Sequence, residues 1–163
     1  IAELDELIDE ILLMSRLDAR ASADRSQQVD IVALVAEECT RYDGCNTSGS
    51  APEIPGDLRL LHRMVRNLLD NAVKHGAPPV TVHLSSTPAD IILTISDGGK
   101  GIPDALRDKV FQPFYRAPDK QNVKGYGLGL PLVRQIAEAH GGTATIVPTG
   151  EAVSAVRVIL PLN

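Results

Sequence analysis

Two pairs of strand-like segments restrict the fold of this chain more than any other feature. Val80–Leu84 and Ile91–Ser96 alternate apolar and polar residues, and Thr143–Val147 and Ala155–Leu160 flank the turn-forming stretch Pro148–Glu151. A period of two predicts β-strands, and the short connections predict two hairpins. Helical patterns lie before and between the hairpins. The sequence therefore predicts an α/β (α+β) two-layer sandwich with one mixed, mostly antiparallel sheet and helices on one face.

Four longer segments carry the three-to-four-residue apolar spacing of amphipathic helices. We expect helices over 1–17, 30–41, 57–75 and 128–140. Asp30 and Asp57 are predicted N-caps, and Gly76 and Gly141 are predicted stops.

Two further segments are shorter or more polar. A short helix is expected from Pro103 to Val110, after a proline suited to a first turn. Residues 43–56 are rich in Gly, Pro, Ser and Asn, which predicts a loop.

Composition narrows the functional classes. A chain of 163 residues can bury one compact core and carry a short appendage. Its net charge of -5 argues against a sequence-independent nucleic-acid binder, so no nucleic-acid partner is expected. Cys39 and Cys45 fit neither a zinc pattern nor a disulfide framework, and two reduced thiols in a cytosolic protein are expected.

The helix expected over 57–75 has two different faces. Asn67, Asn71 and Lys74 stand at i, i+4 and i+7 and share one polar stripe opposite the leucines. An Asn oxygen is a neutral ligand suited to Mg²⁺, and a lysine supplies a point charge to phosphate. A solvated helix face is the alternative for this stripe taken alone.

Two glycine-rich segments follow later in the chain. Residues 97–103 (DGGKGIP) come directly after a predicted strand, where the glycines allow the backbone to approach a flat ring. Residues 124–130 (KGYGLGL) precede a helix, whose free N–H groups bind phosphate. The second segment matches neither the dinucleotide-binding pattern nor a P-loop.

The order of these segments is more specific than any one of them. The series Asn-x-x-x-Asn-x-x-Lys-His, Asp-x-Gly-x-Gly-Ile, Phe-x-Pro-Phe-Tyr-Arg and Gly-x-Gly-Leu-Gly-Leu resembles the N, G1, F and G2 boxes of sensor histidine kinases. These kinases belong to the wider ATPase family of gyrase, the Hsp90 chaperones and the mismatch-repair proteins. The resemblance implies their ATP-binding (Bergerat) fold, with ATP and Mg²⁺ as cofactors.

The resemblance also implies roles for single residues. Asn71 would coordinate Mg²⁺, Asp97 would bind the adenine amine, and Phe114 would anchor a lid over about 104–126. The catalytic residues implied are Asn67, Lys74 and Arg116. The nucleotide-binding residues implied are Asn67, Asn71, Lys74, His75, Asp97, Gly99, Gly101, Ile102, Phe114, Arg116, Lys124, Gly125, Tyr126, Gly127, Leu128, Gly129 and Leu130.

The residue at position 67 distinguishes ATP hydrolysis from phosphoryl transfer to a protein. Hydrolysing relatives carry a glutamate at this position, and an amide cannot act as a general base. The resemblance therefore implies a histidine protein kinase that passes the γ-phosphoryl group of ATP to a histidine on a dimerisation helix. His62, His75, His83 and His140 do not stand in the family's H-box context, so this acceptor is expected outside the present sequence.

The resemblance divides the chain into parts. Residues 1–20 are expected to be the C-terminal end of the dimerisation hairpin, 21–29 a linker, and 30–163 the catalytic ATP-binding domain. Expected partners are ATP, the kinase's own dimerisation and histidine-phosphotransfer domain, and a response regulator, within a homodimer. The expected setting is the cytoplasmic side of a membrane-anchored sensor. At 43–56 the family usually has a longer stretch with two strands, so we expect the sheet to lose pairing at that edge.

Two other functions are compatible with the same fold. An anti-sigma-type serine kinase would lack a dimerisation hairpin, and the apolar repeat in 1–17 argues against it. A non-catalytic domain that uses nucleotide to switch contacts is the other alternative. The presence of Asn71, Asp97 and the G2 glycines argues against this one.

Overall fold

The computed structural model describes residues 2–18, 23–116, 127–150 and 153–163. Its main sheet has five strands in the order β2 (Cys45–Gly49), β4 (Val80–Ser86), β5 (Asp90–Ser96), β7 (Val153–Pro161) and β6 (Thr143–Gly150). β2 runs parallel to β4, whereas the other neighbours are antiparallel. The prediction of a mixed, mostly antiparallel sheet with two hairpins is confirmed.

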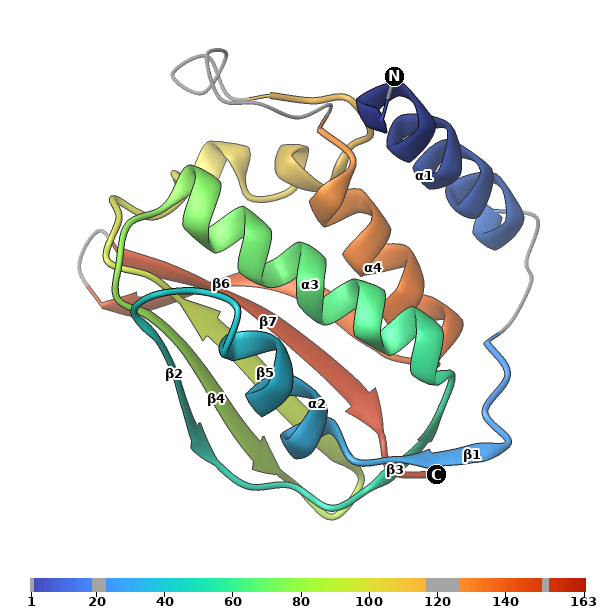
Figure 1. Cartoon of the computed structure of the whole chain (residues 1–163). Helices are drawn as coiled ribbons and strands as arrows, with labels where there is room; N and C mark the ends of the chain where they lie inside the picture. The colour runs from blue at the N-terminus through green and yellow to red at the C-terminus, as the bar shows by residue number, and fades with distance from the viewer. Residues whose placement is uncertain (1, 19–22, 117–126, 151–152) are drawn as a thin grey trace.

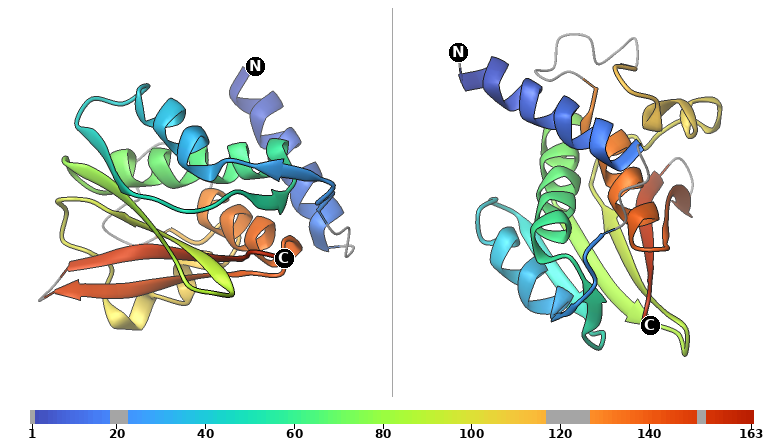
Figure 2. Two further views of the ribbon diagram at one scale, coloured as in Figure 1. Left: turned by 90° about the horizontal axis from the view of Figure 1, so that it is seen from below. Right: turned by 90° about the vertical axis from the view of Figure 1, so that its right-hand side faces the viewer.

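The helices lie over one face of this sheet (Figures 1 and 2). They are α2 (Ile31–Cys39), α3 (Leu58–His75) and α4 (Gly129–Ala139), with α1 (Ala2–Asp18) packed beside α4 at the rim. The two-layer arrangement predicted from the segregated helices and hairpins is therefore confirmed. None of the helices in the described ranges is both long and apolar enough to cross a bilayer.

Both predicted caps are present. The Asp30 carboxylate accepts a hydrogen bond from the Ala33 N–H at 3.0 Å, and Asp57 accepts one from the Leu60 N–H at 3.3 Å. Each satisfies a helix donor that has no partner within its helix. The inner face of α3 is buried in the core, and it is formed by Leu61, Met64, Val65, Leu68, Leu69 and Ala72.

The loop prediction for 43–56 is wrong. This stretch forms β2 and the short β3 (Ile54–Gly56), which pairs with β1 (Gln27–Val29). Val29 and Ile54 are buried where these two strands meet, although 27–29 had been predicted as linker. β2 is polar and largely exposed, so its pairing with β4 overrides a weak intrinsic strand preference. The expected loss of pairing at this edge does not occur.

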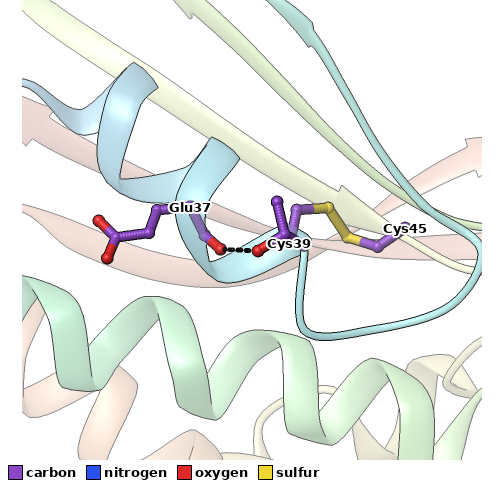
Figure 3. The surroundings of a disulfide bond; sticks show 4 residues. Glu37, Cys39 and Cys45 are labelled. Carbon is purple, nitrogen blue, oxygen red and sulfur yellow. Dashed lines mark hydrogen bonds between the residues drawn. A yellow bond between two sulfur atoms is a disulfide. The ribbon is translucent and has the colours of Figure 1, made fainter.

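The prediction of two reduced thiols is also wrong. Cys39 at the end of α2 and Cys45 at the start of β2 form a disulfide (Figure 3). The turn between them brings the two Cα atoms to 5.5 Å, a separation that a disulfide spans. The six-residue spacing of the two cysteines does not by itself reveal such a turn.

The segment after β5 is less regular than expected. In place of one helix from Pro103 to Val110, the chain forms two 3₁₀ turns, η1 (Asp104–Leu106) and η2 (Lys109–Phe111). Phe111 is buried, and the guanidinium of Arg134 from α4 lies 3.8 Å from its ring centroid. This contact attaches the irregular segment to the helical layer.

Candidate functional site

A cavity of about 830 Å³ lies between α1, α3, the segment after β5 and the start of α4. This volume is typical of sites for small ligands. The cavity is lined by twelve of the residues predicted to bind nucleotide: Asn67, Asn71, Lys74, His75, Asp97, Gly101, Ile102, Arg116, Gly127, Leu128, Gly129 and Leu130. Segments separated by up to about sixty residues in sequence thus meet at one site.

The polar stripe of α3 forms one wall. Asn67, Asn71 and Lys74 all line the cavity, opposite the leucine stripe that anchors the helix in the core. Asn67 is only 9% exposed, and within the described ranges its Nδ2 atom is buried without a hydrogen-bond partner. A buried donor without a partner costs about 1–3 kcal/mol. A ligand with an acceptor oxygen would remove this penalty.

Asp97 stands at the end of β5, where β5 meets the turn after α3. Its Oδ1 atom accepts a hydrogen bond from the Gly99 N–H at 2.6 Å and another from the Ala77 N–H at 3.3 Å. The side chain is partly buried and lines the cavity. Gly99 does not itself line the cavity, and its role in the structure is to hold this carboxylate.

The start of α4 supplies the opposite wall. Leu128 is the N-cap residue and provides no side-chain hydrogen bond to the first turn. Gly129 begins the helix, and a Cβ added there would meet nothing within 4 Å. Gly127 has a φ of 73°, which glycine adopts without strain. The first N–H groups of α4 therefore border the cavity without a capping side chain, as phosphate binding requires.

Five predicted residues are not placed in the cavity wall, and Gly99 is one of them. Lys124, Gly125 and Tyr126 lie outside the described residues. Phe114, predicted as the lid anchor, does not line the cavity, is 60% exposed and has a φ of 65°. The buried aromatic residue of this segment is Phe111 instead.

The acidic side chains of α1 were not predicted to belong to the site. Glu3, Glu6 and Glu10 line the cavity together with Leu7. Their spacing of three and four residues marks one helix face, but only the docking of α1 shows where that face points. Burial raises the pKa of Glu10, and Arg63, whose guanidinium is 3.8 Å away, opposes this shift.

Asp70, Lys100 and Tyr115 also line the cavity without having been predicted. The Asp70 Oδ1 atom accepts a hydrogen bond from the Tyr42 hydroxyl at 2.5 Å, and burial together with this bond raises the pKa of Tyr42. Asp70 precedes the predicted metal ligand Asn71 in the chain. That adjacency was the available signal, but a carboxylate on a helix is too common to be specific.

Comparison with known proteins agrees with this geometry. The family described as "Histidine kinase-, DNA gyrase B-, and HSP90-like ATPase" matches residues 56–163. The probable sensor histidine kinase TcrY of Mycobacterium tuberculosis is 35% identical over 155 residues, which are 88% of this chain and 32% of TcrY. The chain thus spans about a third of the length of this relative.

Two solved structures extend the comparison. The mycobacterial sensor histidine kinase MprB superposes with a TM-score of 0.70 at 31% identity, over 83% of this chain and 96% of the MprB chain. Full-length ShkA in complex with AMPPNP gives a TM-score of 0.80 at 23% identity, over 97% of this chain and 35% of ShkA. The latter likeness concerns the fold alone.

The helix-backed mixed sheet and its cavity are those of the histidine kinase-, DNA gyrase B- and HSP90-like ATPases, and the chain belongs to this family. The predicted family is therefore confirmed. Within it, the chain is an ATP-binding catalytic domain of the sensor histidine kinases. The serine-kinase and non-catalytic alternatives are not favoured by these relatives.

Proposed function

We propose that this domain binds ATP together with Mg²⁺ and presents the γ-phosphoryl group to a histidine on a dimerisation helix hairpin. The observation that carries the proposal is the buried, unpaired Nδ2 donor of Asn67 on the cavity wall. Such a donor is tolerated where a ligand supplies the acceptor, and phosphate oxygens do so. The AMPPNP complex of ShkA, which has the same fold, supports a nucleotide as that ligand.

The cavity residues also fit a metal ion. Asn71 offers a neutral carboxamide oxygen one helical turn from Asn67, and Mg²⁺ prefers oxygen ligands with phosphate completing its shell. Bound Mg²⁺ would neutralise developing charge on the phosphate oxygens. Lys74 and Arg116 would hold the phosphates from two sides of the cavity.

The adenine ring of ATP is assigned to the part of the cavity around Asp97. Asp97 would accept a hydrogen bond from the exocyclic amine of adenine, while Ile102 and Leu128 border the ring. The first turn of α4 would receive the phosphates through its uncapped N–H groups. Held at both ends, ATP is oriented for transfer, and orientation supplies much of the rate in phosphoryl transfer.

Transfer to protein rather than to water follows from the groups beside the phosphates. The Asn67 amide cannot accept a proton from water. Two carboxylates of the cavity wall have partners, because Asp70 accepts the Tyr42 hydroxyl and Glu10 faces Arg63. His62, His83 and His140 contact Glu38, Ser48 and Asp57 respectively, which gives each of them a structural role. His75 lines the cavity and is assigned to contact with the nucleotide, so the acceptor histidine is assigned to a separate helix.

Isothermal titration with AMPPNP and Mg²⁺ tests the site. We expect saturable binding to the wild-type chain, weaker binding of Asn71→Asp with Mg²⁺ present, and weaker binding of Asp97→Asn. Glu53→Gln, an exposed substitution away from the cavity, is the control. Unchanged affinity in both site variants would refute the assignment.

Mixing the domain with a separate H-box helix hairpin and γ-labelled ATP tests the reaction. We expect label on the hairpin histidine and negligible phosphate release without the hairpin. We further propose that residues 1–20 belong to the dimerisation hairpin, 21–29 link it, and 30–163 form the catalytic domain. A homodimeric sensor in the membrane that phosphorylates a response regulator completes the proposal. An unlabelled hairpin would remove the kinase assignment but not the nucleotide site.

A further inference from the structure

The turn that follows α3 packs against the Asp97 carboxylate. Gly76 ends the helix, and a Cβ added to it would overlap the carboxyl carbon and both oxygens of Asp97. The φ of Gly76 is -109°, which any L-residue adopts. A side chain at this position would therefore force the Asp97 carboxylate to shift, whereas the φ of the residue does not call for glycine.

Hydrogen bonds donated by backbone N–H groups join the same two segments. The Ala77 N–H donates to Asp97 Oδ1 at 3.3 Å, and the Gly98 N–H donates to the Ala77 carbonyl at 2.6 Å. Gly99 donates to the same Oδ1 atom from the other side. In the part of the chain that the structure describes, Oδ2 of Asp97 receives no hydrogen bond. One oxygen is thus used for positioning, and the other is left for a ligand.

We infer that Gly76 is a positioning residue that sets the selectivity of the site for 6-aminopurines. The inference rests on the proposed function, in which Asp97 accepts the adenine amine. Close approach of the Gly76 backbone lets Ala77 reach Oδ1, and this contact fixes the direction of Oδ2. A side chain at position 76 would displace the carboxylate, and hydrogen bonds weaken steeply when they are misaligned.

Two nucleotides separate this role from a merely structural one. AMPPNP carries the 6-amino group, whereas the matching β,γ-imido triphosphate of purine riboside lacks it and is otherwise the same. For Gly76→Ala we expect binding of AMPPNP to weaken about tenfold, the loss of one hydrogen bond to a charged acceptor. Binding of the purine riboside analogue should change by less than about twofold, since it makes no such bond.

The matched control is Gly49→Ala. A Cβ there would overlap the Leu84 carbonyl at the sheet edge and Gly49 has a φ of 80°, so this variant is strained outside the cavity. We expect it to lower the melting temperature while leaving the ratio of the two nucleotide affinities at the wild-type value. Equal loss of both nucleotides in Gly76→Ala would overturn the inference.

The outcome for the wild-type chain separates this inference from the proposed function. If the wild-type chain binds both nucleotides equally, the adenine assignment of Asp97 fails. If it discriminates and Gly76→Ala discriminates equally well, only the role of Gly76 fails.

A rescue variant covers a failure of Gly76→Ala to fold. Gly76→Ala combined with Asp97→Ala removes the overlapping carboxylate, so the double variant should regain a cooperative melting transition. A double variant that also fails to fold would show that Gly76 is required for another contact, which overturns the inference.

Discussion

The backbone N–H of Asp57 donates a hydrogen bond to Nε2 of His140 at 3.0 Å, which joins the N-cap of α3 to the end of α4. The Ile136 carbonyl accepts a hydrogen bond from Nδ1 of the same ring at 2.8 Å. Because an N–H can only donate and a carbonyl can only accept, the ring is neutral with its proton on Nδ1. His140 is 1% exposed, so this junction is inside the core.

Acid should destabilise the fold through His140. Burial lowers the pKa of His140 from 6.5, while the bond to Ile136 opposes this shift. The unfolded chain then binds the proton more readily, so stability is fully present above about pH 6.5 and is lost as the pH falls toward the lowered value. Urea unfolding at pH 5 and pH 8 should show a smaller pH dependence in His140→Gln than in the wild type. Identical pH dependence would contradict this assignment.

Replacing Asn67 should raise the stability of the fold and weaken nucleotide binding. Asn67→Leu removes the buried, unpaired Nδ2 donor and keeps the number and branching of the side-chain heavy atoms. We expect the free energy of unfolding without nucleotide to rise by about 1 kcal/mol. AMPPNP affinity should fall, as at sites that trade stability for function. Urea titration and calorimetry on one preparation measure both, and a less stable variant would contradict the prediction.

Glu38 should be a major stabilising residue. Its side chain is 3% exposed, and its carboxylate lies 2.8 Å from His62 Nε2 and 3.3 Å from the Arg66 guanidinium. Glu38→Gln removes the anion that these partly exposed groups contact, and hydrogen bonds to a charged group contribute about 1.5–3 kcal/mol. Arg41→Ala is the comparison, because Arg41 is 54% exposed and 3.6 Å from the same carboxylate. That variant should lose less than about 1 kcal/mol. Equal losses in urea unfolding would refute the ranking.

Reducing the disulfide that joins α2 to β2 should lower the stability of the fold. Cys39 and Cys45 close a short loop, for which chain entropy gives about 2 kcal/mol of stabilisation. In calorimetry we expect dithiothreitol to lower the melting temperature by about 5 °C. The variant Cys39→Ala/Cys45→Ala should melt lower than the oxidised wild type and be insensitive to the reductant. A wild-type melt that dithiothreitol leaves unchanged would contradict the prediction.

The long periodic elements could be predicted from sequence because each carries its own signal. The caps at Asp30 and Asp57 and the buried leucines of α3 follow from local pattern alone. The strand β2 could not be predicted, because its polar residues form a strand only when β4 is beside them. The Cys39–Cys45 disulfide likewise depends on how α2 and β2 pack together, which the turn residues between them do not state.

The candidate site shows the same division. The sequence could group Asn67, Asn71 and Asp97, which line one cavity, because their spacing repeats a known series. The acidic face of α1 was not, since nothing in 1–18 states which surface the helix will contact. The roles of Gly76 and Ala77 could not be read either, because they arise from a close approach of two backbones. Contacts between segments that are distant in sequence follow from the fold and not from the local sequence pattern.

The presence of Glu6 and Glu10 in the same cavity wall as Asn71 has a thermodynamic consequence. A triphosphate bound in this cavity would make the free energy of nucleotide binding depend on the position of the α1 carboxylates. Linkage is reciprocal, so whatever factor a displacement of α1 applies to nucleotide affinity, nucleotide applies to the equilibrium of that displacement. The effect of α1 on nucleotide affinity and the effect of nucleotide on the position of α1 therefore measure the same coupling free energy.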